Sequence, residues 1–229
     1  MRNFAHRLKS SDMDTATPIL NLKPDTAELL AVFDLNRNLG CALLAELTDI
    51  SLPIPADIAS RLEEHRQELA YEGDFWNEEE LKMQFLAFLF RYAQLNEPLK
   101  IKMFYERSLQ AVIGQYKLSV KCDCLLAKPR GIGNPQTPYF FLQEFKKQKQ
   151  SEDAEGQMLA AMLIARHTNA NQKPVYGAFL QGKNWTFTTL HEREYCVSQQ
   201  FDASQSDDLS RIFQTLRNLK RVILVNLAN

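Results

Sequence analysis

The sequence lacks long apolar segments and has few cysteines. No uninterrupted apolar run reaches the roughly 18 residues that a transmembrane helix needs, so we expect no membrane protein. The N-terminus, MRNFAHRLKSSDMD, lacks the apolar central run of a secretory signal. Of the four cysteines, Cys122 and Cys124 are one residue apart while Cys41 and Cys196 are distant, which is not a disulfide framework. We therefore expect a cytoplasmic protein in a reducing compartment.

A charge excess of either sign is also missing. The formal net charge is −1, so no global positive field draws the protein onto nucleic acid or an anionic membrane. Any contact with nucleic acid must come from a local patch. Apolar residues make up 45% of the 229 residues and charged residues 24%, which is typical of globular proteins with a continuous core.

Several familiar binding motifs are absent. The glycines of GIG at 131–133 are not followed by the Lys-Ser/Thr pair of a phosphate-binding loop. The Cys122-x-Cys124 pair is closer than the usual cysteine pairs of zinc sites and has no further Cys or His nearby, which favours packing in a core. The four histidines are scattered, and none lies beside a nucleophile motif.

The chain divides near residue 75. Residues 1–75 are predicted to form a helical N-terminal extension, with a polar lead-in over 1–24, one or two helices within 25–47 and another within 55–73. Residues 76–229 are predicted to form a second domain. Asn77 is a natural N-cap for a helix that opens with three glutamates and carries an apolar stripe from Leu81 to Tyr92.

Strand-like runs follow this helix. We expect strands at about 100–106 and 115–127 and another beginning near residue 137. A helix within 151–169, two strands within 173–192 and a closing helix within 206–226 complete the order. The pattern predicts an α/β fold in which helices flank a mixed sheet.

Two strands combine apolar and charged residues. Glu144 and Lys146 end the run YFFLQEFK, and a strand places residues two apart on one face. Asp123 lies within the apolar run KLSVKCDCLLAK, where a buried carboxylate needs a cation or donors. One loop joins the two strands, so we expect antiparallel neighbours with Asp123 beside Glu144, a pair suited to Mg²⁺. The alternative interpretation of Glu144 and Lys146 is a salt bridge at a strand edge.

With these residues the chain resembles the PD-(D/E)xK nuclease superfamily, whose core runs helix, three strands, helix, strand. The resemblance implies a restriction-endonuclease-like fold and a catalytic set of Asp123, Glu144 and Lys146, in which the two acids bind Mg²⁺ or Mn²⁺ and the lysine positions or activates water. It also implies roles for Gln157 on the next helix and, as a third metal ligand, for Glu80 on the preceding one.

The chain departs from this pattern at two places. Cys122 precedes Asp123 where many members have proline, and Ala161 replaces a second polar residue four positions after Gln157. The run from NEEELKMQF to NWTFTTL more closely resembles an uncharacterised bacterial family of this superfamily, which supplies no substrate.

The resemblance implies a nucleic-acid partner, either DNA or RNA. The run KKQK at 146–149 is a solvated strand end or, together with Lys128, Arg130, Lys173 and Lys183, a patch that holds phosphates. Two functions remain open: a Mg²⁺-dependent nuclease, or a catalytically silent nuclease-fold module that binds nucleic acid or a protein. A homodimer is compatible with either, and no membrane contact is expected.

Overall fold

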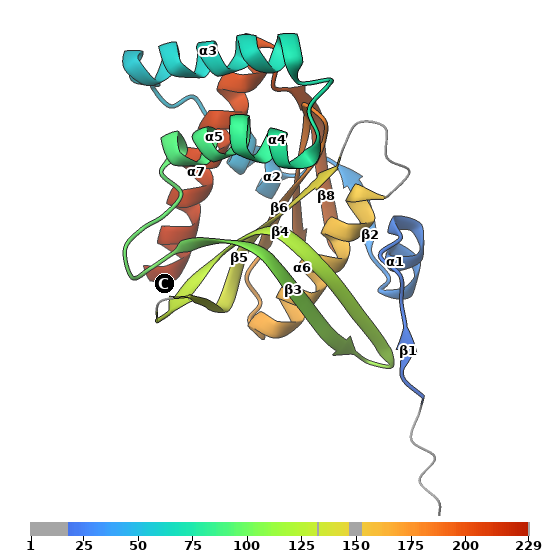
Figure 1. Ribbon diagram of the computed structural model, residues 1–229. Helices are drawn as coiled ribbons and strands as arrows, with labels where there is room; N and C mark the ends of the chain where they lie inside the picture. The colour runs from blue at the N-terminus through green and yellow to red at the C-terminus, as the bar shows by residue number, and fades with distance from the viewer. Residues whose placement is uncertain (1–17, 132, 147–152, 229) are drawn as a thin grey trace, which may run out of the picture.

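The computed structural model describes residues 18–131, 133–146 and 153–228 (Figure 1). Their central element is an eight-stranded mixed sheet in the order β1-β4-β5-β6-β7-β8-β2, with β3 paired to β4 as an additional strand. The strands are β1 (Leu20–Asn21), β2 (Asn36–Leu39), β3 (Lys102–Ile113), β4 (Tyr116–Arg130), β5 (Asn134–Lys146), β6 (Val175–Gln181), β7 (Asn184–His191) and β8 (Glu194–Asp202).

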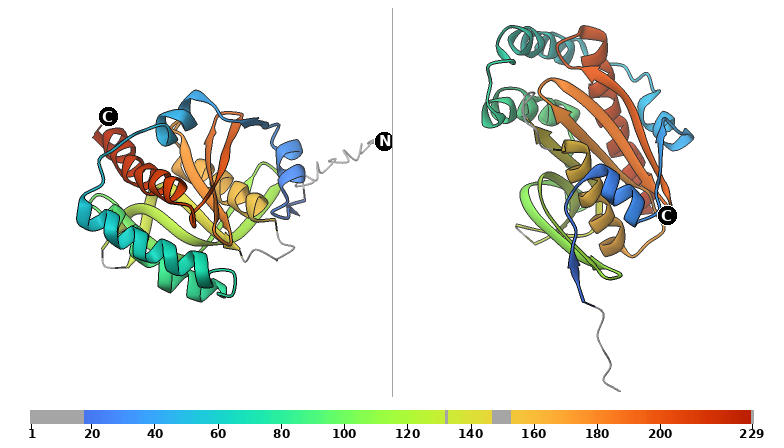
Figure 2. Two further views of the ribbon diagram at one scale, coloured as in Figure 1. Left: turned by 90° about the horizontal axis from the view of Figure 1, so that it is seen from above. Right: turned by 90° about the vertical axis from the view of Figure 1, so that its right-hand side faces the viewer.

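Helices cover both faces of this sheet. They are α1 (Thr26–Val32), α2 (Ala42–Thr48), α3 (Ala56–Glu72), α4 (Glu78–Leu81), a π-helical turn η1 (Lys82–Leu86), α5 (Ala87–Ala93), α6 (Ala154–Asn169) and α7 (Ser206–Ala228). Buried residues of α2, α3, α5 and α7 share one core with one sheet face, whereas those of α1 and α6 share a second core with the other face. The right-hand view of Figure 2 has α1 and α6 toward the viewer and α7 behind the strands.

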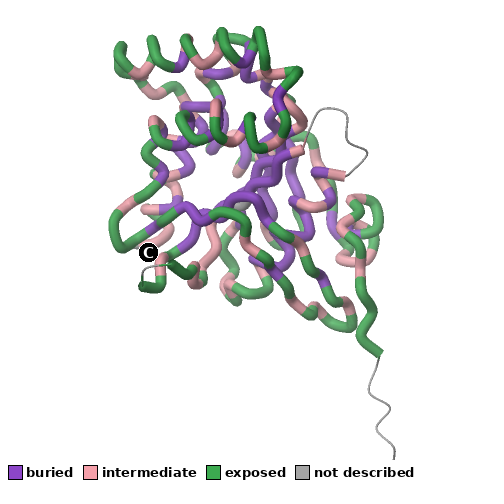
Figure 3. Tube along the Cα trace, in the orientation of Figure 1, coloured by how far each residue is buried: buried purple, intermediate pink, exposed green. Residues whose placement is uncertain are grey.

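The strands that carry the predicted site form an antiparallel meander. β3 pairs with β4 and β4 pairs with β5, both antiparallel, which confirms that the strands of Asp123 and Glu144 are antiparallel neighbours. β5 then pairs with β6 in parallel, so the chain needs a long crossover between them, which α6 provides. Figure 3 shows buried positions along the middle of the sheet and along α6, with exposed positions at the far end of β3 and β4.

Helix α6 is buried on almost every side because the sheet and α1 enclose it. Residues 158–165 are all buried. Its N-cap, Asp153, accepts hydrogen bonds from the backbone N–H of Gly156 at 2.8 Å and from that of Thr26 at 2.7 Å, which ties α1 to α6. A Cβ at Gly156 would lie 2.3 Å from the carbonyl oxygen of Pro24, so glycine permits this close approach.

The structure confirms a mixed sheet flanked by helices. From residue 78 the elements follow the expected order of helix, three strands, helix and strand. The strand expected at 100–106 is longer, because β3 continues to Ile113 and turns at Gly114, which has a φ of +62°.

Two parts of the architecture differ from the expectation. The described part of residues 1–75 is not only helical, since β1 pairs with β4 and β2 pairs with β8 in the main sheet. Strand β8 was also not expected. It carries the buried residues Tyr195, Cys196 and Val197 between polar ends, and it lies between β7 and β2.

Among the residues that the structure describes, no helix has both the length and the apolar composition needed to cross a membrane.

Candidate functional site

The helix that faces the predicted site begins at Glu78. Asn77 caps it as predicted, since its Oδ1 accepts a hydrogen bond from the Glu80 backbone N–H at 3.0 Å. The Asn77 backbone N–H donates in return to Glu80 Oε2 at 2.6 Å, which completes a capping box. The Glu80 side chain, predicted to complete the site, is thus used at the helix end. The helix glutamate whose charge acts on Asp123 and Glu144 is Glu78.

Lys82 lies directly after α4, at the first position of the π-helical turn. Its ammonium is 2.8 Å from Glu78 Oε1, 2.9 Å from Glu106 Oε1 and 3.0 Å from Asp123 Oδ1. It is also 5.7 Å from the centroid of the Phe145 ring. A π-helical turn within an α-helix adds one residue to the turn, and such turns are frequent at functional sites. Lys82 is thus surrounded by carboxylates from one helix and two strands.

Three acidic residues occupy the same level of three adjacent strands. Residue 124 of β4 pairs with residue 105 of β3 and residue 143 of β5. Asp123, one position before residue 124, therefore lies opposite Glu106 of β3 and opposite Glu144 of β5. Glu106 has a φ of +55° and interrupts the β3–β4 ladder at this level. A left-handed backbone at a residue other than glycine is strained and is held by its surroundings. Both contacts of Glu106 are lysines: Lys82 and the more exposed Lys121.

Asp123 is buried, and each of its carboxylate oxygens accepts a hydrogen bond. Its side chain is 10% exposed. Oδ1 accepts a hydrogen bond from Lys82, and Oδ2 accepts one from the backbone N–H of Phe145 at 2.8 Å. The second bond ties the carboxylate of β4 to the strand that carries Glu144. The requirement for a cation and donors around this carboxylate, expected from its apolar strand, is thus met within the protein.

Glu144 and Lys146 lie at the end of β5, next to Asp123. Lys146 Nζ is 3.0 Å from Glu144 Oε1, and both side chains are largely buried, at 13% and 5% exposed. The Lys146 carbonyl accepts a hydrogen bond from the Gly182 N–H at 2.8 Å, which anchors the strand end to the β6–β7 turn. Glu144 and Lys146 are therefore a buried, directly contacting pair rather than an exposed salt bridge at a strand edge.

Burial and like charge disturb the ionisation of this group. Burial, the Asp123 charge and the Glu78 charge raise the pKa of Glu144 to about 8, against the opposing effect of Lys146. Burial also raises the pKa of Asp123, although the Phe145 N–H and Lys82 favour its ionised form. Burial lowers the pKa of Lys82, but its bonds to Glu78, Glu106 and Asp123 outweigh this and raise it overall. Burial is the largest cause of the raised pKa of Glu144, and the charge of Asp123 is the second.

Asp123 and Glu144 carry carboxylate oxygens, the type of ligand that Mg²⁺ takes in proteins. Within the described residues, no group of three or more His, Cys, Asp or Glu side chains is arranged to hold a metal ion. Mg²⁺, however, is commonly bound by one or two protein carboxylates and keeps several waters. Each carboxylate oxygen of Asp123 accepts one bond and retains a second lone pair. Asp123 and Glu144 can therefore offer two oxygen ligands, and an ion bound there would share the Asp123 carboxylate with the Lys82 ammonium.

The sequence analysis also named Gln157 and the two cysteines of β4, which lie at different places in the fold. Gln157 is half-buried in the first turn of α6, the helix that follows β5. Cys122 and Cys124 are both 1% exposed, and burial raises the pKa of both thiols, which is consistent with their predicted place in the core.

The predicted basic patch is only partly available. Lys183 pairs with Asp74 at 3.2 Å, and Lys173 Nζ donates to the Asn226 carbonyl at 2.5 Å. Lys147 and Lys149 lie outside the described residues. Of the expected basic residues, this leaves Lys128 and Arg130 at the end of β4, where no ion pair is found for them within the described part of the chain.

Sequence reasoning missed Lys82, Glu78 and Glu106. Glu80 and Lys82 are two residues apart on a helix and so do not share a face. The informative spacing was Glu78 to Lys82, four residues apart, which places both on one side of a helix. Nothing in the sequence around Glu106 indicates its left-handed backbone or its place opposite Asp123.

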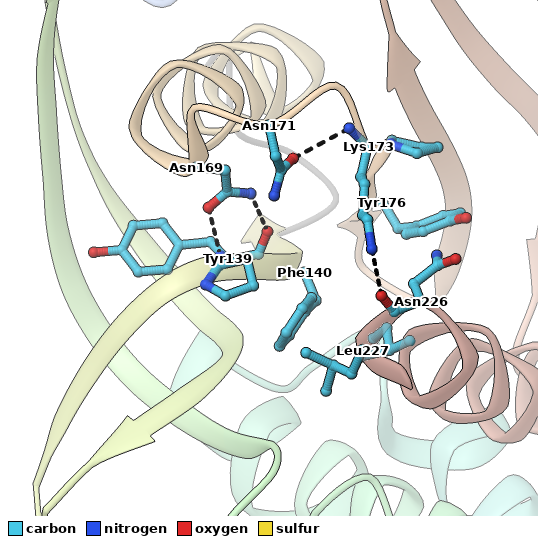
Figure 4. Close-up of a pocket in the computed structure, with 11 residues that line it drawn as sticks. Tyr139, Phe140, Asn169, Asn171, Lys173, Tyr176, Asn226 and Leu227 are labelled. Carbon is cyan, nitrogen blue, oxygen red and sulfur yellow. Dashed lines mark hydrogen bonds between the residues drawn. The ribbon is translucent and has the colours of Figure 1, made fainter. Parts of the chain in front are cut away.

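A separate cavity of about 160 Å³ lies toward the beginning of β5 (Figure 4). Asn169 closes one side of it: its Oδ1 accepts from the Tyr139 N–H at 2.7 Å and its Nδ2 donates to the Tyr139 carbonyl at 2.8 Å. The lining residues are Pro138, Tyr139, Phe140, Asn169, Asn171, Lys173, Pro174, Tyr176, Ile223, Asn226 and Leu227. None of them belongs to the group around Asp123, so this cavity is distinct from the candidate site.

The candidate site is thus a partly buried group of acidic and basic side chains at the junction of α4, β3, β4 and β5. Comparison of the chain with protein-family models and with curated proteins finds no match.

Proposed function

We propose that this protein is a Mg²⁺-dependent phosphodiester hydrolase that cleaves DNA or RNA at Asp123, Glu144 and Lys146. The observation that carries the proposal is the pair of buried carboxylates on neighbouring strands, with the Lys146 ammonium 3.0 Å from Glu144. An acid within one core strand, with an acid and a lysine at the end of the neighbouring strand, is the set that the PD-(D/E)xK resemblance implies. The order of helix, three strands, helix and strand further supports a restriction-endonuclease-like domain from residue 76 onward.

In this mechanism Asp123 and Glu144 hold the metal ion, for which Mn²⁺ can substitute. The bound ion would acidify a water and stabilise negative charge on the phosphate. The remaining work is done by the protein. The Phe145 N–H and Lys82 fix the orientation of the Asp123 carboxylate. Lys146, held by Glu144, places a positive charge beside the attacked phosphate and orients the water.

Gln157 has a secondary role in the proposal. It lies in the first turn of α6, and as a neutral amide it can orient a water or a ligand but cannot supply charge. Its removal should therefore weaken cleavage less than removal of Glu144 or Lys146.

A second candidate function, a silent module that binds nucleic acid or a protein partner, is favoured by one observation. Both oxygens of Asp123 already accept hydrogen bonds, one of them from the Lys82 ammonium. A site whose acid is satisfied by an internal cation can be stable without a metal and without turnover.

The test is cleavage of single- and double-stranded DNA and RNA by the full chain with Mg²⁺ or Mn²⁺. We expect metal-dependent cleavage that Glu144→Gln abolishes. Glu97→Gln is the matched control, since Glu97 forms a lysine pair elsewhere, with Lys220 Nζ 2.9 Å from its Oε2. Absence of cleavage by the wild type, combined with binding of the same nucleic acids, would reject the hydrolase and favour the binding module.

A further inference from the structure

Lys82 is a largely enclosed cation of the candidate site to which neither the sequence pattern nor the resemblance assigns a role. Its side chain is 15% exposed, and its ammonium contacts carboxylates of Glu78, Glu106 and Asp123 within 3.0 Å. The Phe145 ring closes a further side. An ammonium with this many anionic neighbours is not free to contact a phosphate. Its partners are acids of the protein itself.

Two backbone irregularities converge on this ammonium. The π-helical turn starts at Lys82, within a helix that is otherwise regular. The left-handed Glu106 lies opposite Asp123 and directs its carboxylate to Lys82. Each costs free energy relative to a regular helix or strand. Both irregularities are therefore consistent with a backbone whose local shape is held by the contacts between Lys82 and the acids.

We propose that Lys82 is a built-in cation that competes with a divalent ion for Asp123 and so limits metal occupancy of the site. This inference rests on the proposed metal-dependent function and assigns Lys82 as a positioning residue within it. The ammonium is 3.0 Å from Asp123 Oδ1, and a divalent ion on the same carboxylate would be repelled by it at short range in a poorly solvated environment. The π-helical turn would have to adjust when the metal binds.

Removal of the Lys82 charge should therefore tighten metal binding. Lys82→Met keeps the length of the apolar stem but leaves Glu78, Glu106 and Asp123 without their shared cation. We expect Lys82→Met to bind Mn²⁺ at least about tenfold more tightly than the wild type. Lys82→Arg keeps the charge and should bind Mn²⁺ nearly as the wild type does.

Lys121→Met is the matched control. Lys121 also pairs with Glu106, but its side chain is 64% exposed and its only salt bridge within the described residues is to Glu106. Its charge is screened by solvent, so we expect its removal to change Mn²⁺ affinity less than about twofold. If the loss of any nearby positive charge tightened Mn²⁺ binding, Lys82→Met and Lys121→Met would show similar increases in affinity.

The experiment is titration of each full-length variant with Mn²⁺, with free Mn²⁺ measured by electron paramagnetic resonance. Equal affinity in Lys82→Met and wild type would overturn the inference, even if the wild type cleaves nucleic acid. Binding by Lys82→Met alone would support the inference while rejecting metal-dependent cleavage by the wild type. Absence of binding in both would overturn both proposals.

Lys82→Met can also fail to fold, because it leaves three carboxylates uncompensated. The comparison then uses Glu106→Gln with and without Lys82→Met, since the first change removes one of the repelling charges. The double variant should again bind Mn²⁺ at least about tenfold more tightly than Glu106→Gln alone. Equal affinities in this pair would overturn the inference.

Discussion

Glu144 should make the stability of the metal-free protein fall as the pH rises through neutrality. Glu144 is 3% exposed, and burial together with the Asp123 charge raises its pKa from an ordinary value of 4.5 to about 8. Between these two values the folded protein keeps a proton that the unfolded chain has lost. The free energy of unfolding therefore decreases with pH across this window, and the loss is complete above the folded pKa.

The size of the effect follows from the shift. One pKa unit corresponds to about 1.4 kcal/mol, so a shift from 4.5 to about 8 gives a loss on the order of 5 kcal/mol between pH 4.5 and pH 8. Asp123 acts in the same direction, because burial raises its pKa also. Glu106 acts oppositely and outside this window, since its bonds to Lys121 and Lys82 lower its pKa to about 2.

Glu144→Gln isolates this contribution, since an amide of similar shape does not titrate. Urea unfolding of wild type and variant at several values between pH 5 and pH 8, with chelator present, gives the difference in free energy of unfolding. We expect the variant to gain stability relative to the wild type by several kcal/mol over this range. A difference that stays constant with pH would refute the raised pKa and, with it, the close interaction of Glu144 with Asp123.

Three further predictions concern the residues that position the site. Asn77→Ala should lower the free energy of unfolding by about 1 kcal/mol, measured by urea unfolding, because it removes the cap that Glu80 shares. Gly156→Ala should destabilise the protein by more than about 1 kcal/mol in the same assay, because its Cβ would collide with the Pro24 carbonyl; an unchanged midpoint would contradict the close approach of α1 to α6. Millimolar Mn²⁺ should raise the melting temperature of the wild type more than that of Asp123→Asn, and equal shifts would argue against Asp123 as a ligand.

Much of the fold was predictable because its signals are local. The N-cap at Asn77, the apolar stripe that follows it and the β-rich runs predicted at about 115–127 and from about 137 correspond to observed elements, although β4 and β5 extend further toward each other. The antiparallel pairing of β4 with β5 followed from the short loop between them. Strand β8 and the short strands β1 and β2 were missed, since their pairing is decided by distant parts of the sheet rather than by their own sequence.

The site was predictable only where strand periodicity applied. Glu144 and Lys146 are two apart in one strand, and Asp123 is the isolated acid in the next, so the sequence could bring these three together. The contact between Glu78 and Lys82 could be predicted only by choosing one of three consecutive glutamates as the partner of Lys82. In the structure the side chain of Glu80 is used in the capping box instead. Glu106 could not be found, because a left-handed residue in a strand leaves no pattern in composition or spacing.

The most direct test of the central claim is the single-turnover rate of nucleic-acid cleavage by wild type and Lys146→Met at saturating Mn²⁺. Because the proposed mechanism assigns charge and water orientation, rather than metal binding, to Lys146, we predict a rate loss on the order of a hundredfold or more with Mn²⁺ binding retained. Equal rates in the two proteins would contradict the role of Lys146. A wild type that binds Mn²⁺ but cuts no DNA or RNA would contradict the hydrolase itself.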